Sequence, residues 1–197
     1  MDTAALKELY RTELLDNVLP FWETNALDTT YGGFTDFLDR AGVPLSTDKG
    51  GWVQGRGVWV FSTVYRLLDK SDRWLRAAKI GAGFIQEKLI GPDGRAWFEL
   101  TREGKPLVMR RYLFTEMFAA MGLAEYGYIA GDKNAVNKAR ELYAAIDRHH
   151  GTLPEKIQPE TRKFRSHSHT MMLINLCQVL CDVDPDNAIQ YTDRIDK

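Results

Sequence analysis

The chain has few cysteines and no long apolar segment. Its 197 residues include only Cys177 and Cys181, whose i, i+4 spacing places both thiols on one face of an apolar helix, so we expect two reduced core thiols. Residues 1–15 mix charged side chains among the leucines and lack the uninterrupted apolar core of a secretory signal. No run of apolar residues is long enough to cross a bilayer. These features predict a soluble, cytoplasmic protein.

Neither sign of charge predominates. The sequence has 26 Lys and Arg against 27 Asp and Glu, a formal net charge of -1, and the charged residues are scattered. Such a chain produces no long-range field that would attract a phosphate backbone or an anionic membrane. We therefore expect neither nucleic acid nor membrane as a partner.

Several nucleotide-binding, hydrolase and metal motifs are also missing. The sequence has no G-x-G-x-x-G opening a βαβ unit, no phosphate loop G-x-x-x-x-G-K-[ST] and no G-x-S-x-G elbow. Their absence argues against dehydrogenases, kinases and α/β-hydrolases. There is likewise no H-E-x-x-H and no Cys/His quartet, so we predict no metal site.

What the sequence does contain is two alternating kinds of predicted helix. Three segments carry a single apolar stripe and should have one solvated face; they lie within residues 6–18, 74–89 and 135–146. Three others are apolar nearly all round and should be enclosed by neighbouring helices; they span residues 52–68, 112–129 and 168–181. The order outer, inner, repeated three times, predicts a toroid of helical hairpins. Residues 185–197 indicate the start of a further outer helix.

An internal repeat precedes the first two inner helices. GGFTDFLDRAGVPL (32–45) recurs as GRAWFELTREGKPL (94–107) at a constant offset of 62 residues. Each copy has an extended run, a polar turn with Gly42 or Gly104, and then a proline suited to an edge strand. We predict two short β-hairpins on one rim of the toroid. Residues 151–165 stand before the third inner helix, have lost the pattern, and are predicted to form a loop.

Arg56 is the most distinctive candidate for a binding role. It lies in TDKGGWVQGRGVWVFSTVY (47–65) and shares one helical face with Trp52 and Trp59. A guanidinium beside aromatic rings suits a sugar, whose C–H face stacks while its oxygens accept hydrogen bonds. The alternative is that Arg56 pairs with a buried carboxylate and only holds helices together.

Glu116 interrupts the second inner helix and could be that carboxylate. A buried acid is costly unless it is paired or protonated, so Glu116 is either an ion-pair partner or a tuned catalytic group. The sequence leaves both readings open. The Arg110–Arg111 pair just before this helix is interpreted as a feature of the rim.

All four histidines lie in the last third of the chain. His149 and His150 end an amphipathic helix, where a cation favours the helix dipole, so we interpret them as capping residues. His167 and His169 open the third inner helix on the hairpin rim, where a base could remove a proton next to a sugar carbonyl. The alternative is that they only support the site or face solvent.

The sequence resembles the N-acylglucosamine 2-epimerase family. The resemblance is carried by residues 31–65, with WVQGRGVW its most specific part, by residues 94–107, and by MMLINL (171–176). It implies an all-α (α/α)6 barrel about twice this length, so that residues 1–197 form a single domain, the N-terminal half with three helical hairpins. It also implies epimerisation or isomerisation of a free reducing sugar by proton abstraction, without a metal or a redox cofactor.

The resemblance assigns roles to individual residues. Arg56 looks like the family arginine that contacts substrate oxygens, with Trp52 and Trp59 beside it, and Glu116 falls at a polar pocket position. His169 comes near the place where cellobiose epimerases have a histidine, with a register difference of about one residue. We therefore predict His169 and Glu116 as catalytic, and Arg56, Trp52, Trp59 and His167 as substrate-binding residues.

Two alternatives remain at this stage. The family places its main acid–base histidines in the second half, so the chain could instead be a non-catalytic binding module on the same helical frame. Two copies could also close a ring between them as a homodimer. The expected partner in either case is a small sugar.

Overall fold

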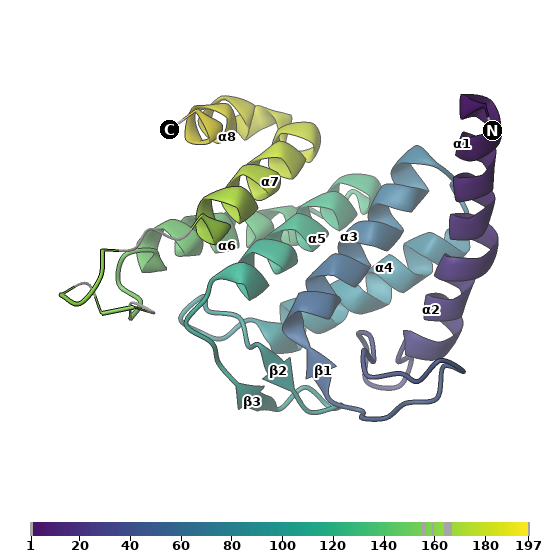
Figure 1. Cartoon of the computed structure of the whole chain (residues 1–197), viewed down its shortest axis with the longest axis horizontal. Coiled ribbons are helices and arrows are strands. Elements are labelled where there is room, and N and C mark those ends of the chain that lie inside the picture. Colours follow the sequence, from purple (N-terminus) through teal and green to yellow (C-terminus); the bar gives the residue numbers. More distant parts are fainter. Residues whose placement is uncertain (1, 155–156, 159, 164–166, 197) are drawn as a thin grey trace.

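The first helical segment stands at one edge of the molecule. The computed structural model describes residues 2–154, 157–158, 160–163 and 167–196 (Figure 1). The segment comprises α1 (Thr3–Thr12), a π-helical stretch (Glu13–Val18) and α2 (Leu19–Ala26). The wider π-helical turns lead into Pro20, which has no N–H to donate to the helix.

The remaining helices form two layers. The inner helices α3 (Gly51–Leu67), α5 (Phe114–Ala130) and α7 (Ser168–Val183) lie side by side. The outer helices are α4 (Asp72–Phe84), continued by π-helical Ile85–Leu89, then α6 (Lys133–His149) and α8 (Ala188–Ile195), which follows a 3-10 turn at Pro185–Asn187. Each outer helix packs on the inner helix before it, and α4 and α6 lie behind α3 and α5 in Figure 1. The predicted alternation of outer and inner helices is confirmed.

Burial explains this layering. The middle helix α5 is buried on all sides from Thr115 to Gly127, as expected for a helix without a polar face. Its close packing against α3 depends on a glycine, because a Cβ on Gly55 would lie 2.3 Å from the Phe118 carbonyl carbon. The apolar stripes of α4 and α6 are buried against the inner layer, which confirms those two predictions.

Two expectations about burial were wrong. The stripe of the first helix is not covered, since Leu6, Tyr10 and Val18 are 37%, 70% and 40% exposed. The inner helices α3 and α7 are also not enclosed all round, because Arg56 and Met171 are exposed. The reason is geometric: the described helices form an open arc rather than a closed ring, so its two edges and its inner face have no neighbour.

The two rim hairpins are confirmed in position, the second as paired strands and the first as an isolated bridge. Strands β1 (Lys49–Gly50), β2 (Glu99–Leu100) and β3 (Pro106–Val108) form an antiparallel sheet in the order β1-β2-β3. The two repeat copies pair alike, Leu38 with Pro44 and Leu100 with Pro106. Gly42 and Gly104 adopt φ of 85° and 91° at the two turns, a region that favours glycine.

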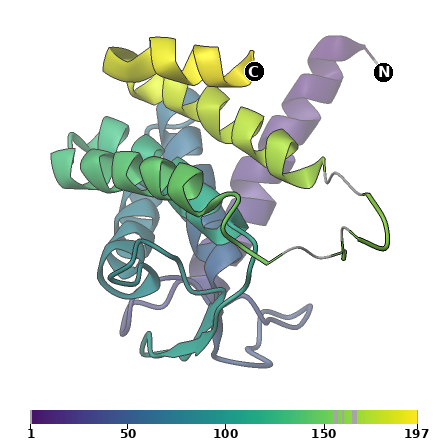
Figure 2. The same ribbon diagram turned by 90° about the vertical axis from the view of Figure 1, so that its left-hand side faces the viewer.

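The sheet lies at the end of the molecule opposite to both chain termini (Figures 1 and 2). The described residues of 151–163 form turns and bends without a strand, as predicted for that loop, and residues 155, 156, 159 and 164–166 lie outside the described part. None of the described helices combines the length and apolar character needed to cross a membrane.

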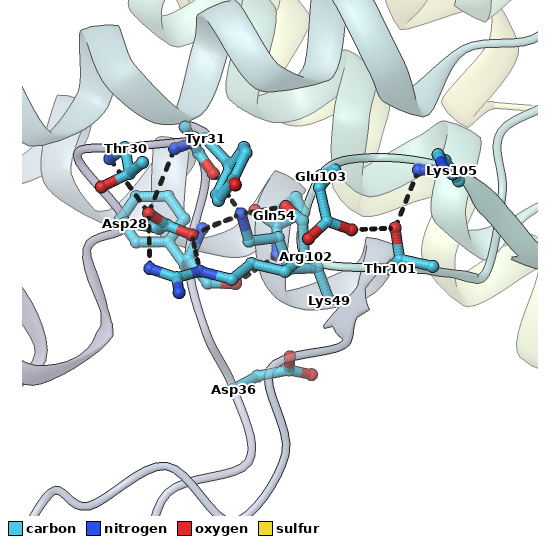
Figure 3. Close-up of polar contacts among 12 residues, drawn as sticks. Asp28, Thr30, Tyr31, Asp36, Lys49, Gln54, Thr101, Arg102, Glu103 and Lys105 are labelled. Atoms are coloured by element: carbon cyan, nitrogen blue, oxygen red, sulfur yellow. Dashed lines mark hydrogen bonds and ion pairs between the residues drawn. The ribbon is translucent and has the colours of Figure 1, made fainter.

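A buried ion-pair network joins the two hairpins to the start of α3 (Figure 3). The Lys49 ammonium is fully buried and donates to the Asp28 carboxylate (3.0 Å) and to the carbonyl oxygens of Gly32 (2.6 Å) and Arg102 (2.8 Å). Every proton of the ammonium therefore has an acceptor. The Arg102 guanidinium also donates to Asp28, at 2.8 Å.

This network sets the protonation of Asp28. Burial alone would raise the pKa of the Asp28 carboxyl, but hydrogen bonds from Arg102, Lys49 and the backbone of Tyr31 and Thr30 outweigh burial and hold that pKa well below its usual range. Burial lowers the pKa of Lys49, and Asp28 opposes that change. Asp28 is thus an anion held between two cations.

Replacing Lys49 by methionine should strongly destabilise the protein. The change leaves the buried Asp28 with Arg102 as its one remaining cationic partner, and removing one partner of a buried pair costs roughly 3 kcal/mol or more. Urea titration would measure the loss. The control Lys79→Met, at an exposed position of α4, should change the free energy of unfolding by about 0.5 kcal/mol or less. Similar small losses in both variants would contradict the role of the network.

Candidate functional site

An aromatic cluster lies where the sheet meets the inner helices. The Trp52 ring contacts three phenyl rings edge-on or tilted, with centroid distances of 5.5 Å to Phe98, 5.8 Å to Phe114 and 6.0 Å to Phe118. Trp52 comes from α3, Phe98 precedes β2, and the other two rings come from α5. The cluster therefore links the second hairpin to two inner helices.

Arg56 lies on this aromatic cluster, one helical turn beyond Trp52. Its guanidinium carbon is 4.0 Å from the centroid of Phe118 and 5.8 Å from that of Trp52. The residue is exposed, and among the described residues its guanidinium has neither a hydrogen bond nor an ion pair. Its donors are free to bind an external acceptor while the rings hold the group in place.

Arg56 borders a hollow of about 320 Å³ between the inner helices. The hollow is lined by Trp59 of α3, Phe118 and Met121 of α5, and Met172 and Asn175 of α7, together with Gly55 and Val60. On its other side Arg56 adjoins an apolar groove of about 420 Å³ between the first helix and α3, lined by residues such as Leu14, Trp22 and Val53. The predicted grouping of Arg56 with Trp52 and Trp59 is thus reproduced, with Phe118 as the nearest ring.

Glu116 does not contact Arg56, so the alternative in which these two residues pair is not realised. The Glu116 carboxylate accepts from Arg95 Nε (2.6 Å) and from the backbone N–H of Ala96 (3.0 Å). Arg95 in turn donates to the carbonyl oxygen of Arg110, at 2.6 Å. The ion-pair reading of Glu116 is therefore realised with a cation of the hairpin, which the sequence pattern alone did not single out.

The repeat explains the placement of Glu116. Gln54 stands 62 residues earlier, and its side chain bonds the backbone N–H and C=O of Phe34 at 2.7 and 2.8 Å. Phe34 and Ala96 are themselves equivalent positions of the two hairpins. The inner helices α3 and α5 therefore each hold the preceding hairpin through one buried side chain. These contacts favour a positioning role for Glu116 over a catalytic one.

The two predicted rim histidines lie apart from the hollow. His167 is exposed just before α7, and the ring of His169 stacks on His150 with centroids 3.7 Å apart. Burial, and then the charges of His150 and Arg194 against the opposing effect of Asp147, lower the pKa of His169 to about 4. His169 is therefore neutral near pH 7, and neither residue is among those that line the hollow.

Sequence reasoning missed Asn175 and Phe118. Asn175 is a polar residue in the otherwise apolar run 171–177, three positions after Met172, and that interruption was the available signal. Phe118 gave no signal, since one more phenyl ring in an apolar helix is indistinguishable from core. Among the described residues, no group of three or more His, Cys, Asp or Glu side chains could hold a metal ion.

The geometry defines a class of protein. An arc of inner and outer helices presents an unpaired guanidinium, an indole and a carboxamide around a hollow, the combination suited to a polyhydroxylated ring. The class is that of two-layered arcs of helical hairpins whose inner face carries a hollow lined by aromatic and polar side chains.

The chain belongs to the N-acylglucosamine 2-epimerase (GlcNAc 2-epimerase) family, whose model matches residues 32–197. It is 32% identical over 182 residues to the N-acylglucosamine 2-epimerase of Bos taurus, covering 88% of this chain and 43% of that protein. A sugar epimerase from a ruminal bacterium is 26% identical with a TM-score of 0.78, covering 94% of this chain and 51% of the other. The cellobiose 2-epimerase of Bacillus thermoamylovorans B4167 is 22% identical with a TM-score of 0.82, and the match covers 98% of this chain and 54% of the other. The chain thus spans about half the length of its relatives.

A double-mutant cycle should show that Glu116 and Arg95 act as a pair. Glu116→Gln leaves the buried Arg95 without a counter-charge and should cost roughly 3 kcal/mol of unfolding free energy. In an Arg95→Met background the same change should cost about 1 kcal/mol or less, because no charge is left unpaired. Denaturant titrations of the four proteins measure both values. An equal cost in both backgrounds would refute the coupling.

His169 should make the protein less stable as the pH falls below neutrality. An unfolded histidine titrates near pH 6.5 and the folded His169 near 4, so between these values the unfolded state binds the extra proton. Stability should fall with a slope of up to about 1.4 kcal/mol per pH unit in that window. His169→Phe keeps a ring against His150 and should flatten the slope, whereas His167→Phe should not. Thermal unfolding at pH 4 to 7 would test this, and identical slopes would exclude the assignment.

Proposed function

We propose that the protein is a sugar 2-epimerase or aldose–ketose isomerase acting on a free reducing sugar, such as an N-acylglucosamine, an N-acylmannosamine or a related aldose. The observation that carries the proposal is the unpaired Arg56 guanidinium on the aromatic cluster, beside a hollow, in a chain of this family. The relatives of the chain include N-acylglucosamine 2-epimerases and cellobiose 2-epimerases, and a D-mannose isomerase shares the fold at a TM-score of 0.78.

The chemistry assigned to Arg56 is stabilisation of negative charge. When a base removes the proton on C2 of an open-chain aldose, the electron pair moves to the carbonyl oxygen and gives an enediolate. A fixed guanidinium that donates to this oxygen stabilises the charge as it develops. Return of the proton to the opposite face of C2 gives the epimer, and transfer to C1 with proton loss from the C2 hydroxyl gives the ketose.

The other residues bind and orient the sugar. Trp59 and Phe118 offer apolar faces to the C–H groups, and Asn175 can both donate to and accept from hydroxyl groups. The described residues lining this hollow include no histidine or carboxylate, so the base of the proposed reaction comes from elsewhere in the protein. Both cysteines are free, as in a reducing compartment, which supports a cytoplasmic location within the same proposal.

Proton exchange with solvent would test the proposal directly. The protein expressed from its complete reading frame should, in deuterated water, replace the C2 proton of mannose, N-acetylmannosamine or cellobiose, seen as loss of its NMR signal. Arg56→Ala should lower kcat/KM roughly 100-fold, the loss typical of an oxyanion donor. The control Arg73→Ala, an arginine over Trp74 on outer helix α4, should keep wild-type kinetics. Sugar binding without exchange would instead support a non-catalytic module.

A further inference from the structure

A second guanidinium lies on the same aromatic cluster as Arg56. The guanidinium carbon of Arg110 is 3.8 Å from the centroid of Phe98, the ring that packs edge-on against Trp52. Arg110 is exposed, and within the described part of the chain its guanidinium makes neither a hydrogen bond nor an ion pair. Other arginines that lie over a ring differ in this respect. Arg66 and Arg73 each pair with a carboxylate, of Glu125 and Glu23.

The backbone of Arg110 is firmly held. Its carbonyl oxygen accepts from Arg95, which the buried Glu116 fixes in turn, and Phe98 donates its N–H to the carbonyl of Val108, at 2.8 Å. The segment that carries Arg110 is therefore bound to both the hairpin and helix α5. A stacked guanidinium on such a segment keeps its donors oriented without an acidic partner.

The two arginines lie at different depths along the inner face. Arg56 is one turn into α3 from Trp52, whereas Phe98 directly precedes β2 and Arg110 follows β3, the strands of the rim sheet. Ring contacts connect the four residues in the order Arg56, Trp52, Phe98, Arg110. A ligand that follows this series of contacts meets a cationic donor at either end.

We propose that Arg110 is a second sugar-binding residue, which donates to the oxygens at the end of the sugar remote from the carbonyl. The inference rests on the proposed function, in which Arg56 takes the carbonyl oxygen. Arg110 then selects for substrates with hydroxyl groups at that remote end, while Glu116 and Arg95 act as positioning residues for it. Arg110 takes no part in proton transfer, so its removal should weaken binding and spare the chemical step.

Kinetics of the complete protein separate these effects. Arg110→Ala should raise KM roughly 10-fold and change kcat by about 2-fold at most, as expected when hydrogen bonds from a charged group are lost from both ground and transition states. Arg110→Lys keeps the charge but loses the planar fork and should lie in between. The matched control is again Arg73→Ala. Glu116→Gln should raise KM in the same direction as Arg110→Ala, but should add little to it in the double variant.

Ligand-observed saturation-transfer NMR reads binding without requiring turnover. With wild-type protein and N-acetylmannosamine, mannose or cellobiose, saturation should reach the protons at C5 and C6 of the reducing sugar, and Arg110→Ala should lose that signal while Arg73→Ala keeps it. A sugar that binds and loses this signal without C2 exchange would support Arg110 and refute the proposed reaction. Turnover with unchanged KM and unchanged saturation in Arg110→Ala would overturn the inference alone. No binding of any of the three sugars would overturn both.

Discussion

The position of the rim depends on one buried side chain in each of the first two inner helices. Gln54 holds the backbone of Phe34, and Glu116 holds the backbone of Ala96, in both cases from the first turns of the helix that follows the hairpin. A polar side chain buried at such a point is stable only if its partners are in place, so the hairpin and the helix fix each other. The second contact lies two residues before Phe98, and Arg95, which Glu116 binds, also donates to the carbonyl oxygen of Arg110, so Glu116 helps to place both Phe98 and the segment to Arg110.

Gln54 is neutral and Glu116 is charged, and the residues at equivalent positions of the two hairpins explain this difference. In the first copy the residue before Phe34 is Gly33, and a Cβ at Gly33 would lie 2.5 Å from Gln54 Oε1. In the second copy the residue at the same position is Arg95, whose guanidinium donates to the Glu116 carboxylate. A neutral amide beside glycine and a carboxylate beside arginine are each consistent, while a carboxylate beside glycine would be a buried, uncompensated charge. The residue on the hairpin, Gly33 or Arg95, thus constrains whether the helix carries an amide or a carboxylate at the facing position.

The sequence predicted the fold well because the fold depends on periodicity. Helix type, helix order and the paired turns at Gly42 and Gly104 all follow from spacings that a single chain displays. The exposed stripe of the first helix was not predictable in this way. Leu6, Tyr10 and Val18 mark an apolar face, but the pattern cannot say whether another helix lies against it. Periodicity shows that a helix face is apolar, and only the structure shows whether another helix covers that face.

The site was predictable where one residue type is unusual and unpredictable where the partner is distant in sequence. Arg56 is identifiable because a guanidinium amid tryptophans on one helical face has few explanations. The partner of Glu116 could not be identified from the sequence, because a buried acid needs a cation and Arg56 was the only cation that the inner-helix pattern brought forward. Arg95 supplies that charge from the hairpin, 21 residues before Glu116. Arg56 is therefore not needed as the counter-charge of Glu116. An arginine whose charge the fold does not use, held by rings rather than by an acid, retains its full hydrogen-bonding capacity for a ligand.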